Sequence, residues 1–106
     1  MARRRTLTDE LREERKRDTA FDVRYQRELA RLQLANQIAK LRERAGLSQA
    51  ALARRIGTQQ AGVARMERSA YQGYTVGTLA KIAAATGATL DVRLIPPVRA
   101  RRAAAR

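Results

Sequence analysis

The sequence contains no cysteine, no histidine and no tryptophan among its 106 residues. The lack of cysteine excludes disulfide bonds, thiolate metal sites and cysteine nucleophiles. The lack of histidine removes the most common general base and the most common metal ligand. The carboxylates form no pair typical of acid–base catalysis, and no glycine-rich phosphate loop is present. We therefore expect a protein that is not an enzyme, with no catalytic residues and no metal, cofactor or small-molecule substrate.

Aromatic residues and long apolar runs are also scarce. One phenylalanine and three tyrosines leave little to line a small-molecule pocket. No apolar run approaches the roughly 20 residues that cross a bilayer. The basic start MARRR is not followed by the apolar stretch of a secretory signal. The absence of cysteine fits a reducing compartment, so we expect a soluble, cytoplasmic protein that does not bind membranes.

Positive charge, by contrast, is in large excess. The chain has 23 lysines and arginines against 10 acidic residues, a net charge of +13. Residues 1–33 carry a net +3, residues 34–97 a net +6, and residues 98–106 a net +4 without any acid. A surface this positive attracts polyanions such as nucleic acid. The length fits one small domain with appendages.

The N-terminal third is predicted to be helical. Leu7–Gln33 lacks glycine and proline and is rich in good helix formers, with Thr8 as the expected N-cap. Apolar residues recur there at helical spacing: Phe21, Tyr25, Leu29 and Leu32. A second apolar stripe follows: Leu34, Ile38, Leu41 and Ala45. The two stripes lie about 200° apart. Either the helix breaks near Leu32, or one long helix has two opposite apolar faces and the second needs its own partner.

Residues 47–68 predict two short helices joined by a tight turn. Ser48 is the expected N-cap of Gln49–Ile56, Gly57 supplies the turn, and Thr58 is the expected N-cap of Gln59–Glu67. Two helices joined in this way cross at a steep angle. Their shared core is formed by apolar and small side chains: Leu52, Ala53, Ile56, Val63 and Met66.

The outward side of the second short helix carries side chains suited to base edges. They are Gln59, Gln60, Ala61, Ala64 and Arg65. Glutamine can pair with adenine, arginine with guanine, and alanine can touch a thymine methyl group. One alternative is that Gln59, Gln60 and Arg65 form a solvated helix face. Another is that Arg65 pairs with Glu67 or a nearby acid. Further surface cations are either phosphate contacts or solubilising charges: Arg54, Arg55, Arg68 and Lys81.

The C-terminal part predicts a loop, a helix and a strand. After the loop Ser69–Tyr74, a helix begins at Thr75 and ends at Gly87. Its expected inward residues are Val76, Leu79, Ile82 and Ala83. Residues 88–95 alternate between apolar and polar, which is typical of a strand, and Pro96-Pro97 ends it. The basic tail 98–106 has nothing to pack and is expected to be disordered.

Residues 34–87 resemble the helix-turn-helix domain of the XRE, or phage-repressor-like, regulators. The resemblance lies in the LSQ opening at residues 47–49, in Ala53 and Gly57, in the R-M-E run at residues 65–67 and in the following helix. It implies an all-α bundle of about five helices whose third helix enters the major groove of operator DNA. It also implies that Gln49 holds a phosphate and braces Gln60. The resulting set of expected DNA contacts is Gln49, Thr58, Gln59, Gln60, Ala61, Ala64, Arg65 and Arg68.

The flanking segments are similar to those of HigA-type antitoxins. The similarity lies in DTAFDVRY at residues 18–25 and in GATLDVRLIP at residues 87–96. It implies a homodimer that represses its own operon and occupies a HigB toxin, a small RelE-like ribonuclease that acts on translated mRNA. The alternatives are a plain XRE repressor without a toxin and, from another class, a basic RNA-binding protein.

These features predict four parts: a helical arm over residues 1–33, the helix-turn-helix domain over 34–87, a strand over 88–97 and the basic tail over 98–106. A lone strand has unpaired edges, so pairing with a second copy through Leu90, Val92 and Leu94 would form the dimer. Seven of the ten acids lie in the arm, which favours a toxin-binding surface around Phe21, Tyr25 and Leu29. The alternative is that this stripe packs back on the bundle.

Overall fold

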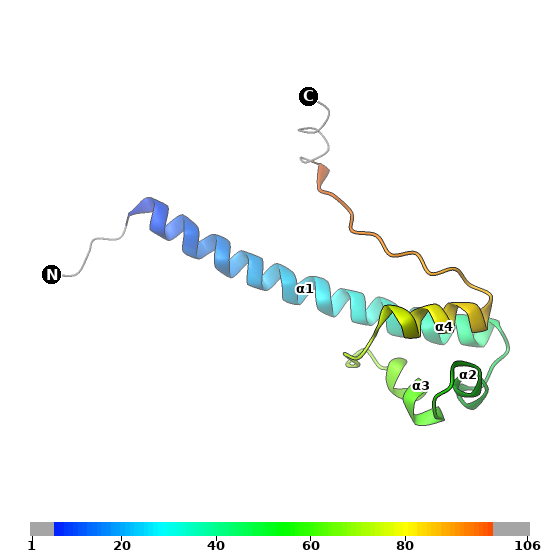
Figure 1. Cartoon of the computed structure of the whole chain (residues 1–106). Helices are drawn as coiled ribbons and strands as arrows, with labels where there is room; N and C mark the ends of the chain where they lie inside the picture. Colours follow the sequence, from blue (N-terminus) through cyan, green and yellow to red (C-terminus); the bar gives the residue numbers. More distant parts are fainter. Residues whose placement is uncertain (1–5, 99–106) are drawn as a thin grey trace.

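The computed structural model describes residues 6–98 and contains four helices over that range (Figure 1). They are α1 (Leu7–Arg44), α2 (Gln49–Ile56), α3 (Gln60–Met66) and α4 (Val76–Thr86). The described part measures 66 × 41 × 18 Å because α1 extends far beyond the other helices (Figure 1). None of the helices within residues 6–98 is long and apolar enough to cross a membrane.

Helix α1 is continuous over 38 residues. It contains neither glycine nor proline, so nothing interrupts its backbone hydrogen bonds near Leu32. The expected N-cap Thr8 was wrong. Thr6 caps the helix instead, because its hydroxyl accepts from the Asp9 N–H (3.1 Å) while the Asp9 carboxylate accepts from the Thr6 N–H (3.2 Å). The expected boundary between residues 33 and 34 therefore lies inside one helix.

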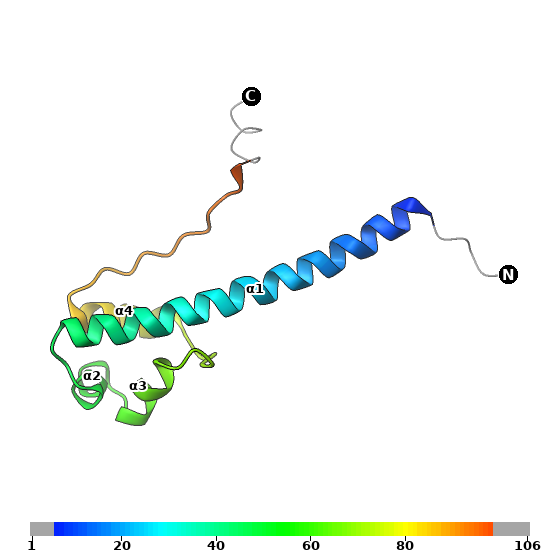
Figure 2. The same cartoon turned by 180° about the vertical axis from the view of Figure 1, so that it is seen from behind.

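The second of the two alternatives for α1 applies, since one long helix has two apolar faces. Its C-terminal third buries Ala35 and Ile38 against the other helices. Its N-terminal part extends away from the domain in both views (Figures 1 and 2). There Phe21 and Tyr25 are 61% and 58% exposed and stack on each other, with ring centroids 6.4 Å apart. Packing of this stripe back on the bundle is therefore wrong.

Helices α2 and α3 form the predicted pair of short crossed helices. Ser48 caps α2, its hydroxyl accepting from the Ala51 N–H (3.0 Å), and Gly57 ends it in the left-handed conformation with φ 76°. Leu52 and Val63 are fully buried between the helices. Thr58 was expected to cap α3, but the N-cap residue is Gln59, which makes no side-chain cap hydrogen bond. The Thr58 N–H donates to the Ala53 carbonyl (2.9 Å) and closes the end of α2. Helix α3 begins one residue later than expected.

Helix α4 closes the core from the other side. The Thr75 hydroxyl accepts from the Thr78 N–H (3.1 Å) at its start, and Gly87, with φ 73°, ends it. Ile82 and Ala83 are buried as predicted. Val76 was expected to face inward but is exposed, because it is the first residue of the helix and lies beyond the packed core.

The predicted C-terminal strand is absent from the described residues. Residues 88–97 are extended but form no strand, because four helices offer no neighbouring strand whose backbone could complete a ladder. Val92 and Leu94 are 66% and 96% exposed. The expected bundle of about five helices is also corrected, since residues 6–98 form four. Apart from residue 98, the predicted disordered tail lies outside the described residues.

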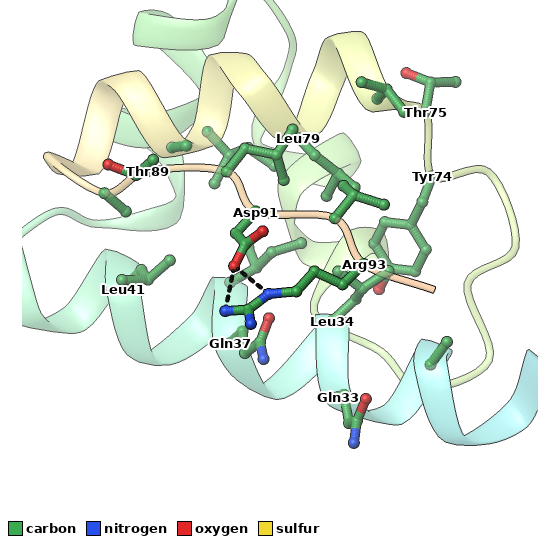
Figure 3. A pocket seen from close by; sticks show the side chains of 18 residues that line it. Gln33, Leu34, Gln37, Leu41, Tyr74, Thr75, Leu79, Thr89, Asp91 and Arg93 are labelled. Atoms are coloured by element: carbon green, nitrogen blue, oxygen red, sulfur yellow. Dashed lines mark hydrogen bonds and ion pairs between the residues drawn. The ribbon is translucent and has the colours of Figure 1, made fainter. Parts of the chain in front are cut away.

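The extended segment borders an open groove between α1 and α4 (Figure 3). The groove has a volume of about 640 Å³ and a mainly apolar lining: Leu34, Ile38, Leu41, Leu79 and Ile82. At its edge Asp91 and Arg93 form an ion pair, with Arg93 Nε 2.8 Å from Asp91 Oδ2. Helices α2 and α3 lie on the other side of α1 and α4 (Figures 1 and 2).

Candidate nucleic-acid interface

Helix α3 exposes most of the side chains that were predicted to contact DNA. Val63 and Met66 are buried, so the opposite side of this short helix faces solvent. Five predicted contacts in and around α3 are exposed, namely Gln59, Gln60, Ala61, Arg65 and Arg68, while Ala64 is half-buried. Thr58 is exposed at the preceding turn. The structure thus brings the predicted base-contacting groups together on one surface.

Gln49 has a structural partner at the start of α2. Its Nε2 donates to Glu67 Oε1 over 3.3 Å, and the residue is half-buried. The described residues show no hydrogen bond between Gln49 and Gln60, so the implied bracing of Gln60 is not made in this arrangement. Gln49 instead ties the start of α2 to the end of α3.

The most strongly connected group at this site was missed by the sequence analysis. Arg42 of α1 donates two hydrogen bonds to Glu67, one from Nε to Oε2 (2.6 Å) and one from Nη2 to Oε1 (3.0 Å). Arg42 Nη1 also donates to the Leu47 carbonyl (2.9 Å). The two side chains are only 14% and 9% exposed. This pair fixes the end of α3 to α1, and a bidentate arginine–carboxylate pair has the geometry to do so rigidly.

The pairing also excludes one alternative for Arg65, an ion pair with Glu67. Glu67 is engaged by Arg42 and Gln49, and Arg65 remains exposed on the surface. The hydrogen bond to Glu67 raises the pKa of Arg42 above its ordinary value, although partial burial acts in the opposite direction. One signal for this role was present in the sequence, because Glu67 is the only acid between residues 44 and 90.

Two tyrosines fasten the loop that follows α3. The Tyr74 hydroxyl donates to the Met66 carbonyl at the end of α3. Tyr71 packs edge-to-face on Tyr74, with ring centroids 4.7 Å apart. Burial, with a smaller contribution from Tyr71, raises the pKa of Tyr74. The loop therefore supports the C-terminal end of α3 from the side opposite α2.

A polar hollow of about 240 Å³ lies beside α3. Its lining includes the cations Arg65 and Lys81 and three hydroxyl groups, those of Thr58, Tyr71 and Thr78. Cations and hydroxyls are the groups that bind phosphate oxygens of nucleic acids. Arg55, in contrast, donates to the Ala85 carbonyl (3.0 Å) and so has a structural contact. Within residues 6–98 no group of histidine, cysteine, aspartate and glutamate could hold a metal ion.

The other predicted contact residues lie away from α3. Phe21, Tyr25 and Leu29 are exposed along the projecting part of α1. In the extended segment after α4, Leu90 is half-buried at the groove while Val92 and Leu94 are exposed. The structure therefore separates three surfaces: the one around α3, the arm of α1 and the groove with residues 88–98.

One comparison with known proteins agrees with this arrangement. A family profile described as a helix-turn-helix domain matches residues 33–94, more than half of the chain. Neither a curated protein nor a solved structure matches the chain significantly. The matched range contains the C-terminal part of α1, which packs in the core, and the whole of α2, α3 and α4. It therefore includes the unit of α2, turn and α3 with its exposed outer face. The chain therefore belongs to the helix-turn-helix domain family, as an XRE-like DNA-binding regulator.

Proposed function

We propose that the protein is a sequence-specific operator-binding repressor that acts through binding and not through catalysis. The observation that carries this proposal is the outer face of α3, which is exposed and contains no acid. Hydrogen bonds from Arg42 and Gln49 to Glu67 fix the end of this helix to α1 and α2. Gln60 and Arg65 are the residues we assign to base edges, because their amide and guanidinium groups match adenine and guanine.

Duplex selection from a random library with the full chain tests this proposal. The selected duplex and a scrambled one are then titrated at several salt concentrations. Gln60→Ala or Arg65→Ala should cost about 1–3 kcal/mol on the selected duplex and little on the scrambled one. Equal losses on both duplexes would make these residues backbone contacts. An RNA-binding protein would show no preferred duplex at all.

We further propose that the repressor is a homodimer joined through the surface around Leu90, Val92 and Leu94. Support comes from the exposed apolar side chains of the extended segment beside the open apolar groove. This surface lies away from α2 and α3, so a second copy there leaves α3 free (Figures 1 and 2). A twofold dimer can present two recognition helices about 34 Å apart, one turn of DNA. If Val92→Asp remains dimeric by light scattering, this surface has no such role.

The wider role we propose is that of a HigA-type antitoxin that also neutralises a HigB/RelE-like toxin. Support comes from the similarity of the flanking segments and from the exposed arm with Phe21, Tyr25 and Leu29. Co-expression with the neighbouring reading frames, followed by sizing and mass spectrometry, tests it. A stoichiometric small basic partner that is toxic alone would support the antitoxin role. A lone homodimer would favour the plain repressor.

Deletion of residues 1–30 separates the two activities. It leaves the buried Ala35 and Ile38 of α1 in place, so the helix-turn-helix domain keeps its core. We expect toxin binding to be lost and operator binding to persist. Retained toxin binding would place the interface elsewhere.

A further inference from the structure

We propose that one face of the part of α1 that projects from the domain is a docking surface for a partner protein. The matching surface of this partner has a basic centre between two apolar patches. This face of α1 does not pair with a second copy of the chain. This face, the arm stripe, consists of Leu7, Leu11, Glu14, Asp18, Phe21, Tyr25, Leu29 and Leu32. The inference rests on the proposed antitoxin function only for the identity of the partner. It specifies the chemistry that this partner must have.

The arm stripe is one continuous face of the helix. At about 100° per residue, its eight members lie within roughly 80° of one another. From Leu7 to Leu32 the stripe runs along about 37 Å of helix. Leu7 is 72% exposed and Leu32 is 48% exposed, so apolar surface is open to solvent at both ends.

The arm stripe is not used by the protein's own domain. Ile38, buried in the core, and Leu41, half-buried beside α4, lie about 140–160° round the helix from the centre of the stripe. The arm also extends away from α2, α3 and α4 in both views (Figures 1 and 2). Folding of the single chain thus leaves this apolar face uncovered.

The charges of the arm are sorted between its faces. The two charged members of the stripe are carboxylates, Glu14 and Asp18, and they lie between the apolar pair Leu7 and Leu11 and the aromatic pair Phe21 and Tyr25. The cations of the arm with described side chains fall about 80° or more from the centre of the stripe: Arg12, Lys16, Arg17, Arg24, Arg27 and Arg31. Residues 7–32 carry as many cations as acids, but the stripe is acidic at its centre.

This pattern disfavours a second copy as the occupant. A parallel in-register pair of arms would place Glu14 opposite Glu14 and Asp18 opposite Asp18. An antiparallel pair that matches Leu7 with Leu32 would place Glu14 opposite Tyr25 and Asp18 opposite Phe21, and the faces of aromatic rings are electronegative. Neither arrangement places a cation of the second copy opposite Glu14 or Asp18, and burying a carboxylate without an opposing counter-charge is costly. The same cost opposes insertion of the stripe into a lipid surface.

A partner with lysine or arginine between two apolar patches offers a complementary group for both the carboxylates and the apolar residues of the stripe. The cations would pair with Glu14 and Asp18, and the patches would cover the leucines and the aromatic pair. Charge-assisted contacts that are shielded from water by surrounding apolar groups are stronger than exposed ones. Complementarity of this kind also selects against other partners, including a second copy.

The test uses the full chain and the basic protein that co-purifies from the neighbouring reading frame, titrated by calorimetry. Glu14→Gln should weaken binding about tenfold, and Glu14→Gln with Asp18→Asn about a hundredfold, with the loss shrinking at high salt. The matched control is Glu13→Gln, the same change one residue away but about 100° round the helix. It should stay within about twofold of the unaltered chain.

The outcomes separate this inference from the proposed function. If the partner binds and the Glu14 and Asp18 variants match the Glu13 control, the inference fails while the antitoxin role stands. If no reading-frame product binds although operator binding is intact, both the antitoxin role and the inference fail. If the Glu14 and Asp18 changes instead strengthen self-association in sedimentation equilibrium, the stripe is a seam between copies. If the full chain floats with anionic phospholipid vesicles through the arm, the occupant is a membrane. Both of these results overturn the inference.

Discussion

The buried ion pair between α1 and the end of α3 allows a quantitative prediction. Replacing Glu67 by alanine removes both hydrogen bonds from Arg42 and the one from Gln49. The Arg42 guanidinium, 14% exposed, then keeps its contact with the Leu47 carbonyl but has lost its closest counter-charge. Loss of one partner of a buried pair costs about 3–5 kcal/mol. Because Arg42 is not fully buried, we expect about 3 kcal/mol.

Urea unfolding followed by circular dichroism measures this cost. With a slope of about 1 kcal/mol per molar urea, the midpoint should fall by roughly 3 M. Small domains have a free energy of unfolding near the lower end of about 5–15 kcal/mol, so Glu67→Ala should be only marginally folded. A double variant, Arg42→Met with Glu67→Leu, should recover most of the loss, because an apolar pair of similar volume needs no counter-charge.

The neighbouring acid is the matched control. Glu43 Oε1 lies 3.9 Å from Arg42 Nη2, and the Glu43 side chain is 68% exposed. Glu43→Ala should therefore lower the free energy of unfolding by less than about 0.5 kcal/mol. If Glu67→Ala and Glu43→Ala shift the midpoint equally, the pair does not hold α3 in place. A double variant no more stable than Glu67→Ala alone would likewise show that the unpaired Arg42 charge is not the source of the loss.

Further predictions concern the loop and the helix ends. Tyr74→Phe removes the hydrogen bond to the Met66 carbonyl and should cost about 1 kcal/mol at neutral pH. The pKa of Tyr74 is raised in the folded protein, so folding favours the protonated form. The contribution of the Tyr74 hydroxyl to the free energy of unfolding is complete below the pKa of an unfolded tyrosine, about 10, and is lost as the pH rises above that value. Urea melts at increasing alkaline pH should therefore converge for the two proteins, and parallel curves would exclude this role. Gly57→Ala should destabilise by about 1–2 kcal/mol because φ is 76° there. Gly77→Ala in α4, where an added Cβ meets nothing within 4 Å, should stabilise by up to about 1 kcal/mol. Thermal melts compare these two glycine variants, and a loss at Gly77 would contradict the helix-propensity argument.

Local sequence determined the helix-turn-helix unit and its outer face. Ser48 caps α2, Gly57 adopts the left-handed conformation, and Leu52 and Val63 are buried between the helices, as predicted. These features depend on neighbours a few residues apart, where capping, backbone freedom and apolar spacing act directly. The exposure of Gln60 and Arg65 follows from the same periodicity. The misplaced caps at Thr8 and Thr58 were errors of one or two residues within correctly predicted helices.

Tertiary structure decided the features that depend on distant partners. The pairing of Arg42 with Glu67 joins residues 25 positions apart, and no local pattern specifies which of many arginines meets the one central acid. The strand expected at residues 88–95 did not form, because alternation supplies a face but a strand also needs a neighbouring backbone, and the fold provides none within the described chain. The sequence alone likewise left open whether α1 breaks near Leu32. Because the helix continues, the domain covers one apolar face and the arm stripe remains exposed.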